Sequence, residues 1–420
     1  MISRLYSLIY TGLFFILLIG SGCAGEQNRD LTYEIEPSEI SDHIHWLADP
    51  GLEGRLAGTK NEARAANYIA DHFRQFGLEP GGEEDTFLQV FTLNGPMAQA
   101  MDRENSLSRN VIGIIPGKSE IDEYLVIGAH YDAQGMGGII SLDESTEPAV
   151  HPGADDNASG TAGILELAHY FSEIRPERTL VFIAFSGEEL GLLGSRYFVE
   201  NSTLPGGEIL AMVNLDMIGR MENHSLSIMG TGTAEVWPDL IEQANTDTLD
   251  ISQVSTGRGA SDHTSFYEKD IPVLHYFTGT HADYHRSGDT ADKINLEGTA
   301  QVIRHVKRVI AKLDTIDASK LSFIHSGDRQ PEEMRMEGVT LGVLPDYSYD
   351  GVGLKLEQVR SGDPGDLSGM QSGDIIIELD GNLVNDIFDY MNLINAFEPG
   401  DTVEFLILRD GEKIPIEVTF

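Results

Sequence analysis

The sequence predicts an α/β fold, a mixed and mostly parallel sheet covered by helices, followed by a smaller β-rich domain. Three observations support it. Apolar runs without polar alternation, as at 124–129 and 179–185, are typical of strands buried on both faces. Segments with apolar residues at three- and four-residue spacing lie between such runs, as at 61–76. After residue 336 the strand-like runs become short and turn signals separate them.

The larger domain is expected to span residues 37–314. A first helix begins at Pro37, and a stronger one spans 61–76, where Gly77 follows as a C-cap. The remaining elements alternate. Strands are expected at 110–115, 124–129, 179–185, 209–215, 226–229 and 273–277, and helices at 160–171, around 190–197 and at 296–313.

The second domain is expected to span residues 337–420. Its strands are placed at 353–359, 374–379, 402–408 and 413–418, and its helix near 387–397. The pairs Asp380-Gly381 and Asp410-Gly411 are typical of tight turns between strands. The polar stretch 315–336, which includes Gly327-Asp328 and Pro331, is interpreted as a linker.

The N-terminus has the order of an export signal. Arg4 precedes the apolar run 13–19, three small residues follow, and Cys23 comes next. Residues 1–23 therefore resemble a bacterial lipoprotein signal with Cys23 as the lipidated residue, although Gly20 stands where such signals usually carry Leu. An ordinary signal peptide or a short membrane anchor are the alternatives. Residues 24–36 are interpreted as a tether.

Two consequences follow for location and partners. The protein is expected in the periplasm or cell envelope, held at the membrane only through lipidated Cys23, which is the sole cysteine and therefore forms no intramolecular disulfide. Lys and Arg number 28 against 68 Asp and Glu, a net charge of −40 that disfavours nucleic-acid binding because phosphate backbones are repelled.

Potential metal ligands follow several predicted strands. Parallel strands bring their carboxyl ends to one edge of a sheet, where ligands bind in open α/β folds. The candidates are His130, Asp132, Asp155, Asp156, Asn157, Glu188, Glu189, Asp216 and His285. Taken alone, each of these short patterns is more typical of a structural role than of a metal ligand: His-x-Asp of a surface pair, Glu-Glu of a helix start and Asp-Asp-Asn of a turn or N-cap. Together, two imidazoles and several carboxylates match the ligands of Zn²⁺ and indicate a metal-binding protein, with a hydrolase favoured.

Spacing assigns further roles. His130 and Asp132 lie two residues apart on an extended segment, so their side chains share a face and the carboxylate can orient the imidazole. Of the adjacent Glu188 and Glu189, one can bind metal while the other stays free as a base.

The combined motifs resemble the M28 family of zinc peptidases. They are His130-Tyr131-Asp132, the runs at 153–160, 187–195 and 214–219, Tyr284-His285, and the front segment Leu52-Glu53-Gly54-Arg55. The resemblance implies one zinc on His130, Asp156 and Asp216, and a second on Asp156, Glu189 and His285. It implies Glu188 as general base, with Asp132 holding His130. Tyr276 or Tyr284 is expected to assist the oxyanion, and Ser261-Asp262-His263 either lines the pocket or forms a structural turn.

The resemblance implies an aminopeptidase that removes N-terminal residues from peptides by attack of metal-activated water. A single-zinc glutaminyl-peptide cyclotransferase, a related amidase or carboxypeptidase, and a non-catalytic scaffold are the alternatives. A protease-associated insert is not expected, because residues 80–110 offer too few positions. The C-terminal domain resembles a bacterial PDZ domain in residues 349–354 and 369–381, which implies binding of a peptide C-terminus by strand addition. A structural appendage without a ligand is the alternative there.

Overall fold

The computed structural model describes residues 33–420 apart from 120–122, 144, 146, 327–338, 347–348, 350, 361, 386 and 395. The predicted export signal, Cys23, most of the tether and the end of the linker lie outside the described residues. Among the residues that are described, no helix has both the length and the apolar character needed to cross a membrane.

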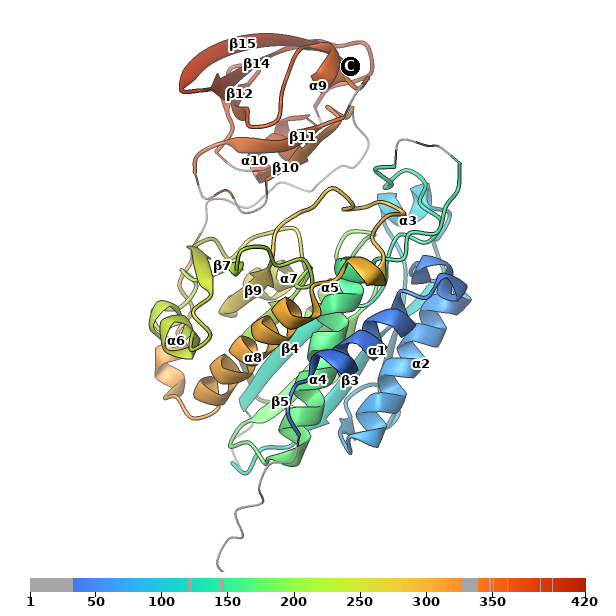
Figure 1. Cartoon of the computed structure of the whole chain (residues 1–420), viewed down its shortest axis with the longest axis vertical. Coiled ribbons are helices and arrows are strands. Elements are labelled where there is room, and N and C mark those ends of the chain that lie inside the picture. Colours follow the sequence, from blue (N-terminus) through green and yellow to red (C-terminus); the bar gives the residue numbers. More distant parts are fainter. Residues whose placement is uncertain are drawn as a thin grey trace, which may run out of the picture. The chain divides into compact units, whose positions relative to one another are not determined.

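A nine-stranded sheet forms the centre of the larger domain (Figure 1). Its strands are β1 (Glu79–Pro80), β2 (Leu88–Thr92), β3 (Leu107–Ile115), β4 (Glu123–His130), β5 (Thr179–Phe185), β6 (Glu208–Leu215), β7 (Ser225–Met229), β8 (Asp250–Val254) and β9 (Val273–Phe277). Their order is β1-β3-β5-β4-β6-β9-β7-β8, with β2 paired to β3. Strands β5, β4, β6 and β9 run parallel, whereas β3 and β7 join them antiparallel. The predicted mixed α/β sheet is confirmed.

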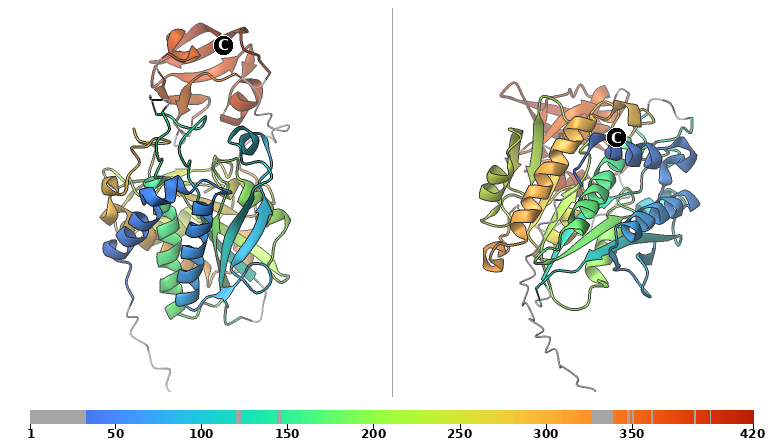
Figure 2. Two further views of the ribbon diagram at one scale, coloured as in Figure 1. Left: turned by 90° about the vertical axis from the view of Figure 1, so that its right-hand side faces the viewer. Right: turned by 60° about the horizontal axis from the view of Figure 1, so that its bottom comes forward.

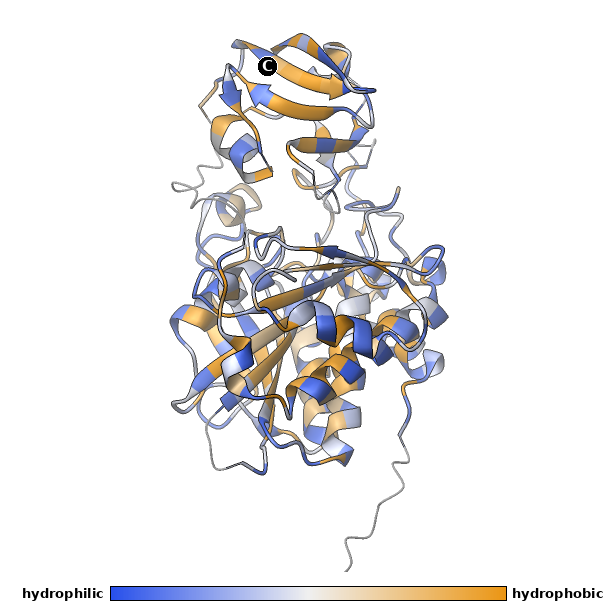
Figure 3. Cartoon of the chain, turned by 90° about the vertical axis from the view of Figure 1, so that its left-hand side faces the viewer, coloured by the Kyte–Doolittle hydropathy of each residue, from blue (hydrophilic) through white to orange (hydrophobic). Residues whose placement is uncertain are grey.

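Helices cover both faces of this sheet (Figure 2). They are α1 (Pro37–Leu47), α2 (Lys60–Gln75), α3 (Pro96–Ala100), α4 (Gly160–Glu173), α5 (Leu193–Glu200), α6 (Trp237–Ala244), α7 (His263–Tyr267) and α8 (Leu296–Leu313). The main core lies between one face and α1, α2, α4, α6 and α8. On the other face, Phe198 of α5 and Phe266 of α7 pack in a second cluster. The hydrophobic colouring of the central strands in Figure 3 agrees with a sheet buried on both faces.

The C-terminal domain is an antiparallel sheet with its own core. Its elements are β10 (Val343–Pro345), β11 (Leu354–Val359), α9 (Pro364–Leu367), β12 (Ile375–Leu379), β13 (Asn382–Leu383), α10 (Ile387–Ile394), β14 (Thr402–Arg409) and β15 (Glu412–Thr419). Leu356, Phe405 and Ile407 are fully buried in it. Asp410 and Gly411 have φ of 51° and 82° between β14 and β15, the left-handed pair that a two-residue hairpin requires.

The last residues of the predicted tether and the first half of the predicted linker are packed against the larger domain. Ile35 is 1% exposed, and its carbonyl accepts a hydrogen bond from Arg304. Leu321 is 4% exposed and joins the main core, and the Ser326 hydroxyl donates to the Ser255 carbonyl at 2.7 Å. Single apolar residues anchor these segments without periodicity, which is why composition alone did not indicate them.

Candidate metal centre

The predicted ligands meet at the carboxyl edge of the central parallel strands. His130 is the last residue of β4, Asp216 follows β6, and Glu188 and Glu189 follow β5. Because β4 is paired in parallel with both β5 and β6, these ends lie side by side. Asp156 comes from the segment before α4, and His285 from the loop after β9.

One group of ligand atoms surrounds His130. Its Nε2 lies 3.2 Å from Oδ1 of Asp156 and 3.3 Å from Oδ1 of Asp216. The three side chains are buried, and their ligand atoms lie within 4.8 Å of one another. This spacing allows a single cation to contact all three.

A second group surrounds His285. Its Nε2 lies 3.3 Å from Oδ2 of Asp156 and 3.6 Å from Oε2 of Glu189. These three residues also have ligand atoms within 4.8 Å of one another. The two oxygens of Asp156 therefore face different imidazoles, the arrangement a bridging carboxylate requires.

Glu188 and Asp132 lie beside the first group. Oε2 of Glu188 lies 3.9 Å from Nε2 of His130, farther than the carboxylates of Asp156 and Asp216. On the other side of the ring, Nδ1 of His130 lies 3.2 Å from the Asp132 carbonyl oxygen and 3.7 Å from its carboxylate. The Asp132 carboxylate also accepts from the Glu188 backbone N–H at 3.3 Å. Asp132 thus contacts both the imidazole and the loop that carries Glu188.

Two residues outside the predicted set hold the ligands in place. Oδ2 of Asp289 accepts from the backbone N–H of Asp155 at 2.9 Å and of Asp156 at 3.0 Å. Gln134 donates to Oε2 of Glu189 at 3.1 Å. Sequence reasoning did not assign these roles, although Asp289 lies in the same loop as His285.

The protonation of the site follows from burial and from the crowding of carboxylates. Burial lowers the pKa of His130, but the carboxylates of Asp216 and Glu188 outweigh it and raise that pKa well above its usual value. Burial, with the negative charge of Asp156, raises the pKa of Glu189 to about 8. Burial likewise raises the pKa of Glu188 well above its usual range. Without a bound cation, the site stabilises the ionised form of these two glutamates poorly.

The residues present fit a bound divalent cation. Oε1 of Glu189 and Oδ2 of Asp132 are buried without a hydrogen-bond partner in the described part of the chain. Imidazole nitrogens and carboxylate oxygens are the donors that Zn²⁺ accepts. A cation at each group would offset the mutual repulsion of the carboxylates.

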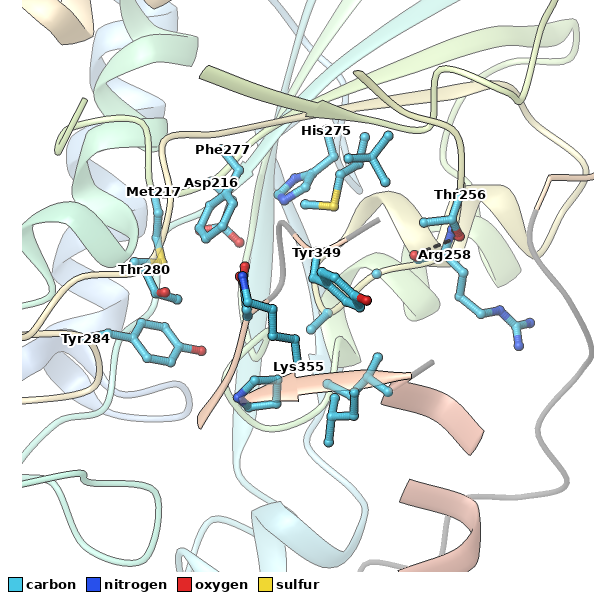
Figure 4. A pocket seen from close by; sticks show the side chains of 18 of the residues that line it. Asp216, Met217, Thr256, Arg258, His275, Phe277, Thr280, Tyr284, Tyr349 and Lys355 are labelled. Carbon is cyan, nitrogen blue, oxygen red and sulfur yellow. Dashed lines mark hydrogen bonds and ion pairs between the residues drawn. The ribbon is translucent and has the colours of Figure 1, made fainter. Parts of the chain in front are cut away.

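An apolar cluster borders the polar site. Met217, Met229, Val254 and Phe277 pack together with Tyr284. These residues line one pocket with Asp156, Glu188, Asp216 and His285. Figure 4 shows the side chains of Asp216, Met217, Phe277 and Tyr284 around it. A substrate reaching the ligand groups therefore meets an apolar wall.

The two tyrosine candidates lie in different places. Tyr276 is fully buried, and its hydroxyl lies 3.2 Å from Nδ1 of His305 in the core, away from the ligands. Tyr284 stacks on His285 with ring centroids 3.8 Å apart and lines the pocket. The Ser261-Asp262-His263 segment is buried, and its Ser261 hydroxyl accepts from Asn214 at 2.8 Å.

Each of the two domains matches a known family. Residues 110–311 match the family described as Peptidase family M28, and residues 334–420 match the PDZ domain. Residues 110–311 therefore resemble M28 peptidases, and the C-terminal domain resembles PDZ domains. The resemblance predicted from the motifs is confirmed.

Individual relatives agree with this assignment. A probable zinc metalloprotease of Pyrenophora teres is 34% identical over 242 residues, covering 54% of this chain and 49% of its own. A probable leucine aminopeptidase of Arthroderma benhamiae is 28% identical over 311 residues, covering 67% of this chain and 82% of its own. The chain spans about half the length of the first curated relatives it matches.

Solved structures share the fold. A leucine aminopeptidase precursor from Bacteroides thetaiotaomicron aligns with a TM-score of 0.54 at 21% identity, covering 66% of this chain and 98% of its own. A glutaminyl cyclase from Porphyromonas gingivalis aligns with the same TM-score, 0.54, at 18% identity, covering 66% of this chain and 98% of its own. The same sheet and helices therefore occur in proteins named for two different reactions.

Proposed function

We propose that this protein is an exported dizinc aminopeptidase that hydrolyses N-terminal residues from peptides. The observation that carries the proposal is the placement of Asp156, whose two oxygens lie 3.2 and 3.3 Å from the imidazoles of His130 and His285. Asp216 would complete one zinc site and Glu189 the other. The M28 domain and the relatives named zinc metalloprotease and leucine aminopeptidase support the same reading.

Glu188 is the general base of the proposed reaction. When bound, zinc supplies Lewis acidity that makes water acidic and polarises a carbonyl. Glu188 projects beside His130 at 3.9 Å without occupying a ligand position, so it is free to take a proton from the attacking water. It then delivers that proton to the leaving amine. Asp132 orients His130 and, through the backbone N–H of Glu188, holds the base.

The charge of the site favours a substrate with a free α-amino group. Five carboxylates converge there, and this concentration of acidic groups attracts a substrate ammonium group. The carboxylates are those of Asp132, Asp156, Glu188, Glu189 and Asp216. The neighbouring cluster of Met217, Met229, Val254 and Phe277 favours an apolar first side chain.

A glutaminyl-peptide cyclotransferase is the second candidate, because a structure named glutaminyl cyclase shares the fold. That reading requires a single zinc and leaves part of the ligand set without a function. Here both ligand groups have compatible spacing, which favours the two-metal reading.

The other domain and the N-terminus complete the proposal. The PDZ domain binds the C-terminus of a peptide as an added strand, which presents substrates or holds a partner. The export signal delivers the protein to the periplasm or cell envelope, where lipidated Cys23 anchors it. Neither role requires nucleic acid.

A panel of aminoacyl amides tests the proposed activity. The metal-loaded protein is expected to hydrolyse leucine and methionine amides, to lose that activity after chelation, and to regain it with zinc. N-acetylated versions of the same amides are the matched control. Hydrolysis of acetylated and free amides at equal rates would exclude an aminopeptidase, and cyclisation of N-terminal glutamine without amide hydrolysis would favour the second candidate.

A further inference from the structure

Arg55 is a fully buried cation enclosed by backbone carbonyls. It is 0% exposed, and its guanidinium donates four hydrogen bonds. Nε donates to the Tyr131 carbonyl at 2.6 Å, Nη2 to the Gly153 carbonyl at 2.7 Å, and Nη1 to the Leu47 carbonyl at 2.9 Å and to the Pro152 carbonyl. In the described part of the chain it forms no ion pair within salt-bridge distance.

Three of these carbonyls, those of Tyr131, Pro152 and Gly153, belong to two of the segments that carry the ligands. Tyr131 lies between His130 and Asp132, and Gly153 begins the turn that leads to Asp156. The planar guanidinium of Arg55 therefore connects the end of β4 to the segment that carries Asp156. A guanidinium suits this contact because its N–H donors bind several acceptors at fixed angles, whereas the donors of an ammonium have no fixed geometry.

The backbone around Arg55 adopts an unfavourable conformation that places the side chain there. Glu53 and Arg55 have φ of 47° and 34°, in the left-handed region that residues with a side chain rarely adopt. Gly54 has φ of 65°, and a Cβ at this position would lie 2.4 Å from the Gly135 carbonyl oxygen and 2.5 Å from that of His151. Three consecutive left-handed residues thus bring the 53–55 segment against the loops of the metal centre.

The charge of Arg55 also suits its position. Burial lowers its pKa to about 10, whereas Asp132, Asp289, Asp156 and Glu189 act in the opposite direction, so the group remains charged at neutral pH. It is therefore a fixed positive charge behind a cluster of carboxylates. That charge reduces their repulsion while leaving every ligand oxygen free for a cation.

We propose that Arg55 is a positioning residue of the metal centre, which sets the separation of the His130–Asp132 and Gly153–Asp156 segments and so determines the affinity for both cations. This inference rests on the proposed dizinc function and extends it to a residue that contacts neither metal nor substrate. Residues that orient metal ligands typically alter metal affinity about 10- to 100-fold when they are replaced.

Arg178 provides a matched control within the same domain. It is 9% exposed, and it donates to the Leu313 carbonyl at 2.6 Å, to the Ile316 carbonyl at 2.5 Å and to Glu123 at 2.7 Å. It also binds carbonyls from a buried position, but next to α8 rather than the metal centre. Arg178→Met therefore measures how much stability is lost when a buried arginine that binds carbonyls is removed at a distance from the metal centre.

The test is zinc affinity, measured on the full chain by competition with a chromophoric chelator. Arg55→Met and Arg55→Lys are expected to weaken zinc binding by about 10-fold or more, Arg55→Lys less than Arg55→Met because it keeps the charge. Arg178→Met is expected to lower the thermal unfolding temperature while its zinc affinity stays within about threefold of wild type. Arg55→Lys keeps the inference testable if Arg55→Met does not fold.

A folded Arg55 variant with wild-type zinc affinity would overturn the inference. Equal losses of zinc affinity in Arg55→Met and Arg178→Met would overturn it as well. The readout is independent of the proposed activity. If wild type binds zinc but cleaves no aminoacyl amide, the proposed function fails while the affinity comparison still decides the role of Arg55. If wild type cleaves amides and the Arg55 variants bind zinc normally, only this inference fails.

Discussion

Replacing Glu188 with Gln isolates the proton-transfer step from metal binding. The side chain is 12% exposed and keeps its shape in the variant. The backbone N–H of residue 188 still bonds Asp132. Glu188→Gln is therefore expected to fold and to bind metal as wild type does.

The size of the effect follows from the role of the base. A positioned base typically contributes 10²- to 10⁴-fold, so kcat is expected to fall by about that factor, or roughly 3–5 kcal/mol in the activation barrier. The assay is leucine amide hydrolysis at saturating zinc, with metal content measured on the same samples. Glu200→Gln, at the exposed end of α5, is the matched control and should keep wild-type kcat. A Glu188→Gln enzyme with normal metal content and kcat within threefold of wild type would refute the assignment.

Three further outcomes are expected. Phe277→Ala opens the apolar wall of the pocket and should lower the preference for leucine over alanine amide by about tenfold in kcat/KM; an unchanged ratio would exclude that wall from specificity. Burial lowers the pKa of His305 to about 4 from 6.5, so its contribution to stability is complete above pH 6.5 and is lost as pH falls towards 4. Between pH 7 and 5, His305→Gln should therefore lose about 2 kcal/mol less unfolding free energy than wild type, and equal losses would contradict this reading. Thr233→Val leaves Trp237 Nε1 and the Val273 backbone N–H without their acceptor and should cost about 2 kcal/mol, or about 5 °C in unfolding temperature; unchanged denaturant and thermal midpoints would argue against it.

The central elements were predictable because their patterns are strong. The apolar runs at 124–129 and 179–185 correspond to β4 and β5, and the helix predicted at 61–76 corresponds to α2 at Lys60–Gln75. The weaker edge of the domain was missed. Strand β8 has one buried residue, Val254, and neither alternation nor an apolar run distinguishes it from a loop.

The candidate ligands were predictable for a different reason. They follow apolar strands directly, so a parallel sheet brings them together regardless of their distance in sequence. The residues that hold them lack such a signal. Arg55 acts through backbone carbonyls, and no sequence pattern shows which carbonyls a buried arginine will meet. Likewise, the sequence does not show which way the Tyr276 side chain points. In the structure its hydroxyl lies beside His305 in the core.

Metal content per chain tests the central claim most directly. Two zinc ions are expected to remain bound to the wild-type protein after dialysis, and almost none to Asp156→Ala, because both ligand groups share that carboxylate. His285→Ala should retain the ion held by His130 and Asp216. A wild-type protein with one zinc, or an Asp156→Ala variant that keeps two, would contradict the account.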